Sequence, residues 1–252
     1  MRIILTSVLA CFVIVAFAQS SSSTIVASNA AELSSKKREV AAQKPDSKLD
    51  SLKTAYLRMV QEHPGYVPAL DQLAGLYRSM GQLDSAIFYY QRSLELQPGG
   101  IIARQSLAAA YLVQEDYPTA ISHYQQLIRQ HPDYPEAYQG LARVYLAQKA
   151  YEKAIQNSEI ALRWYLIAKK HEHAADARML AGQAYMGIRD YKRAIKYFKA
   201  SKKHFKDKAF YHYYIGYSYL RLNKEKEAMT YLRTAQNMGY QLPTYVKARL
   251  TD

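Results

Sequence analysis

Hydrophobic and polar positions follow a pattern that repeats along most of the chain. A tyrosine recurs at one point of this pattern, and an alanine follows each of these tyrosines nine residues later. The tyrosines are Tyr77, Tyr111, Tyr145, Tyr185 and Tyr219, and the alanines are Ala86, Ala120, Ala154, Ala194 and Ala228. Successive tyrosines lie 34, 34, 40 and 34 residues apart, so one step carries six extra residues. A period of this length is typical of a solenoid of stacked units.

Each unit contains two runs of apolar residues at helical spacing. In the unit around Tyr111, the first run is Leu107, Ala108, Tyr111 and Leu112, and the second is Ala120, Ile121, Tyr124, Leu127 and Ile128. The polar stretch between them ends at Pro118, which predicts a short turn between two antiparallel helices. We therefore expect an all-α fold.

Small, aromatic and helix-ending residues recur in a fixed order in every unit. In the first unit they are Leu73, Ala74, Tyr77, Gly81, Ala86, Tyr90, Ser93 and Pro98. This order resembles the tetratricopeptide-repeat family, whose unit is a 34-residue helix-turn-helix. The resemblance covers Val67 to Leu242. It implies a right-handed superhelical solenoid of antiparallel helix pairs that acts by binding other proteins.

The ends of the chain are expected to differ from the array. Arg2 precedes an apolar stretch that ends in Ala16-Phe17-Ala18, which predicts a secretory signal peptide over residues 1–18. An uncleaved anchor and a lipoprotein acylated at Cys11 are the alternatives. The remaining expected segments are a flexible tether over 19–45, a capping helix over 46–66, an array of five repeats over 67–242 and a second capping helix over 243–252.

Cys11 is the only cysteine of the chain. Cleavage after Ala18 would remove it, and the mature protein would then have neither disulfides nor thiolate ligands. We therefore expect an exported protein, periplasmic or associated with the cell envelope, that packing alone holds together.

The six extra residues fall between Tyr145 and Tyr185. The helix that begins at Tyr151 is expected to continue through Ile167, so that the second helix of this unit gains a turn. Trp164 and Tyr165 would then either cover a longer joint between units or form an exposed aromatic docking site.

No motif for catalysis or cofactor binding occurs in the chain. A Gly-rich phosphate loop, a nucleophile elbow and a paired metal motif are all missing, so we expect no enzyme activity, cofactor or small-molecule substrate. His171 and His173 would point about 200° apart on a helix and could not chelate one ion. No metal site is therefore expected.

Positive charge is concentrated in the last third of the chain. The net charge is +13, and residues 166–252 hold 18 basic and 7 acidic side chains. Five lysines at three- and four-residue spacing are expected to form one stripe on a helix: Lys192, Lys196, Lys199, Lys203 and Lys206. The stripe is either a solvated face or a contact for an acidic protein, an anionic membrane or an envelope polymer. Nucleic acid is not an expected partner of an exported chain.

In the resembled family, the first helix of each unit lines a concave groove. The resemblance implies that a partner contacts Arg78, Gln105, Gln139, Arg143, Met179, Gln183, Phe210, Tyr213 and Tyr217. None of them is a lysine or an asparagine, so the clamp for a C-terminal carboxylate found in chaperone-binding members is not expected. The lining becomes aromatic towards the C-terminus, and tyrosine rings are rigid anchors for extended peptides.

We therefore expect a scaffold that holds a peptide or a partner protein in this groove. The alternative is an assembly or structural factor of the envelope, tethered to the membrane by its N-terminus or its basic helix.

Overall fold

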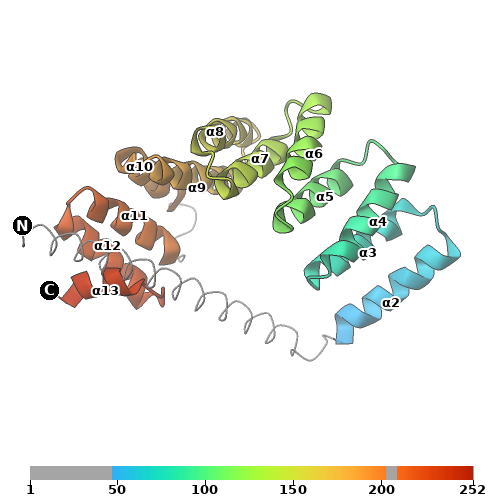
Figure 1. Cartoon of the computed structure of the whole chain (residues 1–252), viewed down its shortest axis with the longest axis horizontal. Helices are drawn as coiled ribbons and strands as arrows, with labels where there is room; N and C mark the ends of the chain where they lie inside the picture. Colours follow the sequence, from blue (N-terminus) through green and yellow to red (C-terminus); the bar gives the residue numbers. More distant parts are fainter. Residues whose placement is uncertain (1–46, 203–208, 252) are drawn as a thin grey trace, which may run out of the picture. The chain divides into compact units, whose positions relative to one another are not determined.

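The computed structural model describes residues 47–202 and 209–251, which contain helices and turns but no strand (Figure 1). The predicted signal peptide over 1–18, Cys11 and the tether over 19–45 lie outside the described residues. The helices are α2 (Ser47–Glu62), α3 (Val67–Ser79), α4 (Leu83–Leu96), α5 (Ile101–Val113), α6 (Tyr117–Gln130), α7 (Pro135–Ala147), α8 (Tyr151–Ile167), α9 (His171–Gly187), α10 (Tyr191–Lys202), α11 (Ala209–Arg221), α12 (Glu225–Asn237) and α13 (Thr244–Thr251). In this part of the chain, no helix is both long and apolar enough to cross a membrane.

The predicted helix pairs are confirmed. Helix α3 packs on α4, α5 on α6, α7 on α8, α9 on α10 and α11 on α12. Each second helix also packs on the first helix of the next pair, so that the described array is continuous from α3 to α12. The fold is an all-α solenoid of antiparallel helix pairs.

The paired helices approach closely because alanine occupies the contact positions. The five alanines of the repeat pattern, Ala86, Ala120, Ala154, Ala194 and Ala228, have no exposed surface. Leucines and aromatic rings fill the space around them, such as Leu107, Leu127 and Phe198, each at most 1% exposed. The tyrosine-to-alanine period is therefore a packing pattern.

The turns within the pairs share one backbone feature. Each contains one residue with a positive φ, between 58° and 74°, at the equivalent position: Gly81, Glu115, Lys149, Arg189 and Asn223. A left-handed residue after the first helix redirects the backbone and lets the helix end satisfy its carbonyl groups. Four of these five are not glycine, so the surrounding helices impose this conformation.

Helix α8 runs from Tyr151 to Ile167 as expected, but it carries only part of the insertion. Helix α8 has three residues more than α4 and α6, and α9 has four more than α3, α5 and α7. The connection 168–170 is one residue shorter than the connection 131–134, so the net addition is six residues. The longer ends of α8 and α9 stabilise each other through a small core of Ala161, Tyr165, Ala174 and Ala177. Tyr165 is fully buried there, so it does not form an exposed docking site.

The two terminal helices differ in how much surface they bury. Val246 of α13 is fully buried in a cluster with Leu232 and Leu242. Among the described side chains of α2 none is buried, and Met59 is 36% exposed. In sequence, His63-Pro64 after α2 matches His131-Pro132 after the second helix α6.

Gly182 provides a test of the close packing. A Cβ atom on Gly182 would lie 2.6 Å from the ring of Phe198, which is fully buried and cannot move aside. We expect Gly182→Ala to lower the free energy of unfolding by about 1–3 kcal/mol through overpacking. Denaturant titration of the purified protein measures this loss. Gly99→Ala, at a site with no neighbour within 4 Å, is the control and should have a much smaller effect. Equal stability of the Gly182 variant and the parent would refute the packing described.

Tyr124 makes the stability depend on pH. Its ring is 3% exposed, and burial raises the pKa of its phenol from 10.0 to about 12. Between these values the unfolded chain releases the proton while the folded chain keeps it, so the stability present below pH 10 is lost as the pH rises towards 12. At about pH 11 the loss from this group is about 1.4 kcal/mol.

Tyr124→Phe should therefore reduce the fall in unfolding free energy between about pH 8 and about pH 11 by that amount. The comparison is made by denaturant titration at both pH values, with Tyr66→Phe at a 49% exposed site as the control. If both variants fall as steeply as the parent, the phenol of Tyr124 is not buried as described.

Candidate functional site

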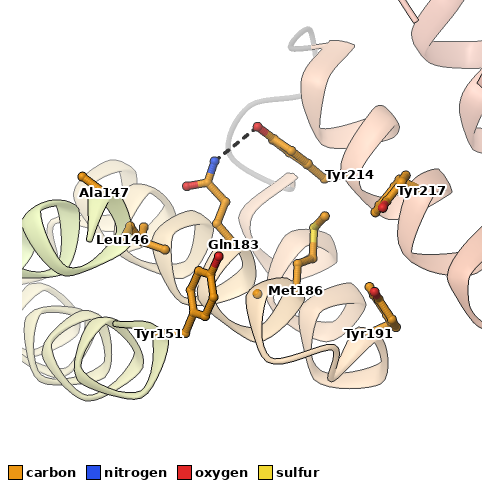
Figure 2. Close-up of a pocket in the computed structure, with 9 residues that line it drawn as sticks. Leu146, Ala147, Tyr151, Gln183, Met186, Tyr191, Tyr214 and Tyr217 are labelled. Carbon is orange, nitrogen blue, oxygen red and sulfur yellow. Dashed lines mark hydrogen bonds between the residues drawn. The ribbon is translucent and has the colours of Figure 1, made fainter. Parts of the chain in front are cut away.

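A pocket of about 520 Å³ opens between the third, fourth and fifth helix pairs. It is lined by Leu146, Ala147, Tyr151, Gln183, Met186, Gly187, Tyr191, Tyr214 and Tyr217 (Figure 2). Most of these residues come from the first helices α7, α9 and α11, and Tyr151 and Tyr191 begin the second helices α8 and α10. We call it the tyrosine pocket.

The pocket forms where the spacing of the first helices changes. Helix α3 touches α5, α5 touches α7 and α7 touches α9, whereas no contact of comparable extent joins α9 to α11 in the described part of the chain. Successive second helices, such as α4 and α6, do not touch each other to this extent in the described part of the chain. The first helices therefore lie on the inner side of the array, and the tyrosine pocket is a gap on that side.

The residue at one position differs sharply in size between α7 and α11. The position that Tyr214 occupies in α11 is held by Gly140 in α7. A Cβ on Gly140 would lie 2.2 Å from the ring of Tyr124 in α6, so the absence of a side chain there lets α7 pack closely on α6. Tyr214 instead places its ring against Phe198 of α10, with the ring centres 5.3 Å apart. Helix α11 thus packs on α10 through an aromatic ring, and this ring also lines the tyrosine pocket.

Gly187 shapes the opposite wall. A Cβ at this position would be 2.4 Å from the ring of Tyr151, so the ring of Tyr151 lies directly against the backbone of α9. The ring of Tyr151 therefore lies at the edge of the tyrosine pocket, and no side chain at position 187 covers it (Figure 2).

One hydrogen bond crosses the pocket. The amide Nε2 of Gln183 donates to the hydroxyl of Tyr214 at 3.3 Å (Figure 2). The amide oxygen of Gln183 and the hydroxyls of the surrounding tyrosines add polar groups to a wall of rings and Met186. Such a surface suits a ligand with apolar side chains and backbone amide groups.

The phenols of Tyr217 and Tyr213 have raised pKa values. Burial raises the pKa of Tyr217 above its ordinary value, and the nearby Tyr245 adds to the rise. Burial has the same effect on the pKa of Tyr213. These hydroxyl groups can therefore donate hydrogen bonds under physiological conditions.

Two of the nine predicted groove residues, Gln183 and Tyr217, line the tyrosine pocket. Arg78 and Arg143 are exposed on α3 and α7 without a place in it. Met179 is partly buried against the core cluster that contains Tyr211 and Ile215.

The other predicted groove residues make internal contacts. Gln139 is 8% exposed and accepts a 2.7 Å hydrogen bond from the hydroxyl of Tyr165, and Gln105 accepts one from Tyr134. The ring of Tyr213 stacks on Tyr240 at 4.7 Å, and the ring of Phe210 lies 4.4 Å from that of Tyr211. These side chains are thus used in contacts within their own units.

The predicted lysine stripe is partly described. Lys192, Lys196 and Lys199 are exposed on α10, whereas Lys203 and Lys206 lie outside the described residues. The ammonium group of Lys199 donates to the hydroxyl of Tyr219 at 2.8 Å and lies 5.2 Å from its ring centre. This hydrogen bond raises the pKa of Lys199. Lys199 is thus tied to the last helix pair, and Lys192 and Lys196 remain directed to solvent.

No binding role was predicted from the sequence for Tyr151, Tyr191, Met186, Gly187 or Tyr214. Tyr151 and Tyr191 occupy equivalent positions at the start of successive second helices, and this recurrence was the available signal. The width of the joint between α9 and α11 had no such signal, because it depends on three-dimensional packing.

Other features of the described residues are less suited to a ligand. A hollow of about 680 Å³ is lined by the consecutive residues His63 to Tyr66 together with Met59 and Glu62, so it is a corner of the chain. No group of three or more histidine, cysteine, aspartate or glutamate residues within 47–202 and 209–251 is placed to hold a metal ion.

Comparison with known proteins agrees with this architecture. Three family models, each described as a tetratricopeptide repeat, match residues 67–99, 111–156 and 179–239, together more than half of the chain. No curated protein matches the sequence.

Several solved structures share the fold. The chain is similar to one in the APC/C hetero-tetramer Cut9-Hcn1, with a TM-score of 0.68 and 19% identity over 81% of this chain and 39% of that one. It is similar to YrrB, described as a TPR protein with an unusual peptide-binding site, with a TM-score of 0.58 and 19% identity over 78% of this chain and 97% of that one. It also resembles a tetratricopeptide-repeat protein from Parabacteroides merdae, with a TM-score of 0.60 and 16% identity over 84% of this chain and 80% of that one.

Proposed function

Since the chain belongs to the tetratricopeptide-repeat family, we propose that it is a non-catalytic scaffold whose tyrosine pocket binds an extended segment of a partner protein. The fold itself supports a role in protein interaction, because stacked helix pairs leave a long inner surface that no neighbouring unit covers. The tyrosine pocket is the place on that surface where a side chain of the partner would enter.

The observation that carries this proposal is the composition and openness of the tyrosine pocket. Four tyrosines, a methionine and a glutamine from three successive helix pairs face one gap of about 520 Å³. Tyrosine offers a large rigid surface at low entropic cost together with a hydroxyl group for the ligand backbone. These are the properties that an extended peptide requires of its receptor.

A fold neighbour with a peptide-binding site supports the mode of binding. YrrB carries that description, and the chain covers 97% of its length. The shared fold makes peptide binding on the inner surface a reasonable expectation, while the identity of 19% does not transfer particular contacts.

We propose further that the protein is exported and acts in the periplasm or cell envelope, as the signal-like sequence of residues 1–18 suggests. The exposed Lys192 and Lys196 favour a second candidate, a factor that contacts an anionic membrane or envelope polymer. Release from that surface by salt would distinguish this role, because screening weakens contacts between exposed charges.

Filling the tyrosine pocket tests the proposed function. Ala147 is exposed at the pocket edge, so Ala147→Trp should occlude the pocket without disturbing the buried core. With a photoreactive phenylalanine analogue in place of Tyr217, illumination of cells should yield a discrete crosslinked partner, which mass spectrometry identifies. The additional Ala147→Trp change should remove this product.

The matched control is Gln125→Trp, which places the same side chain at an exposed site of α6 outside the pocket. This control should retain the crosslink. A crosslink that survives Ala147→Trp, or the recovery of no product above the unilluminated background, would contradict binding in the tyrosine pocket.

A further inference from the structure

A second hollow adjoins the tyrosine pocket. It measures about 340 Å³ and is lined by Tyr217, Leu220, Arg221, Asn223 and Tyr245. Tyr217 lines both hollows, so the two are adjacent. We call the second hollow the arginine hollow.

Arg221 stands where the preceding unit has no side chain. Its position in the last turn of α11 is equivalent to that of Gly187 in α9. Whereas Tyr151 lies against bare backbone at Gly187, Tyr191 meets a guanidinium group: Nε of Arg221 donates to the hydroxyl of Tyr191 at 3.2 Å. The guanidinium carbon also lies 5.7 Å from the ring centre of Tyr191. One nitrogen is thus used to fix the direction of the side chain.

The rest of this guanidinium has no acidic partner. Among the described residues, no carboxylate lies within ion-pair distance of Arg221. The nearest acidic group of the adjoining turn, Asp190, is paired with Arg193 at 2.5 Å. Arg221 is fully charged, and its hydrogen bond to Tyr191 raises its pKa further. Two NH₂ groups of a fixed arginine therefore remain available for an acceptor.

The surroundings strengthen this preference for an anion. Arg189 is exposed in the turn before Tyr191, and Lys192 is exposed in the first turn of α10. The phenols of Tyr217 and Tyr245 lie close enough to Arg221 to affect its pKa. Burial keeps the phenol of Tyr217 protonated and able to donate. A planar guanidinium with neighbouring hydroxyl donors matches a carboxylate better than any other common group of a peptide.

We propose that the arginine hollow binds the carboxylate of an aspartate or glutamate in the same segment whose apolar side chain occupies the tyrosine pocket. This inference rests on the proposed function and adds the chemistry of the partner: an extended acidic segment, with an apolar or aromatic residue beside the acidic one. Arg221 donates a hydrogen bond to Tyr191, and Tyr191 lines the tyrosine pocket, so one contact links the two subsites.

Selection from a library of fully random peptides, displayed with free and with blocked C-termini, tests this specificity on the full chain. Selected peptides should carry aspartate or glutamate next to an aromatic or branched residue, with either terminus. Arg221→Gln should weaken their binding by about 10- to 100-fold, the value of one charge-assisted interaction. Arg129→Gln, which makes the same charge change at an exposed site of α6, should leave the affinity unchanged.

A double-mutant cycle gives the decisive readout. Changing the acidic residue of a selected peptide to its amide should weaken its binding to the parent protein by the same factor as Arg221→Gln does. The same change in the peptide should not weaken its binding to the Arg221→Gln variant any further. Circular dichroism and thermal unfolding confirm that the variant is folded.

The outcomes separate the two proposals. Selected peptides that lack acidic residues and bind the parent and Arg221→Gln equally would overturn the arginine hollow while leaving the tyrosine pocket intact. Dependence on a free C-terminus alone would also overturn it, since the carboxylate would then come from the chain end. If no peptide is selected, or if selected peptides bind Ala147→Trp as well as the parent, the proposed function fails too.

Discussion

The structure depends on the close approach of paired helices at alanine. Where Ala86, Ala120 and their three equivalents meet the partner helix, no side chain beyond a methyl group separates the two backbones. Each unit buries this contact against the next, and a solenoid has no other source of cohesion because its units touch only their neighbours. The described array also has no cysteine, so packing alone has to hold it together. A larger residue at such a position would affect the local pair and the joint beside it.

Differences in side-chain size also shape the candidate site. Glycine at position 140 lets α7 approach the ring of Tyr124, whereas tyrosine at the equivalent position 214 of α11 stacks on Phe198 and lines the tyrosine pocket. The gap exposes tyrosines from three helix pairs, and Arg221, in the place of Gly187, gives its rim a positive charge. The repeats therefore share one fold but differ in surface chemistry, and the tyrosine pocket and Arg221 both lie in the C-terminal half.

The sequence predicts the helix pairs well because their contacts are local and repeat with a fixed period. Tyr165 shows the limit: its spacing allowed a buried or an exposed role, and the added turn of α9 that covers it had no separate signal. Gln139 was expected to face a ligand, but the hydroxyl of Tyr165, 26 residues away in the chain, satisfies its side chain instead. This pairing within one helix pair, and the spacing of α9 and α11, depend on three-dimensional packing that the repeat pattern does not encode.

Chemical footprinting of the tyrosines tests whether a partner binds in the tyrosine pocket. Nitration of the protein followed by mass spectrometry reports which phenols a bound partner covers. We expect the partner to protect Tyr191, Tyr214 and Tyr217, whereas Tyr66, which is 49% exposed and outside the pocket, should stay as reactive as in the free protein. Unchanged reactivity of the three pocket tyrosines in the presence of a bound partner would contradict it.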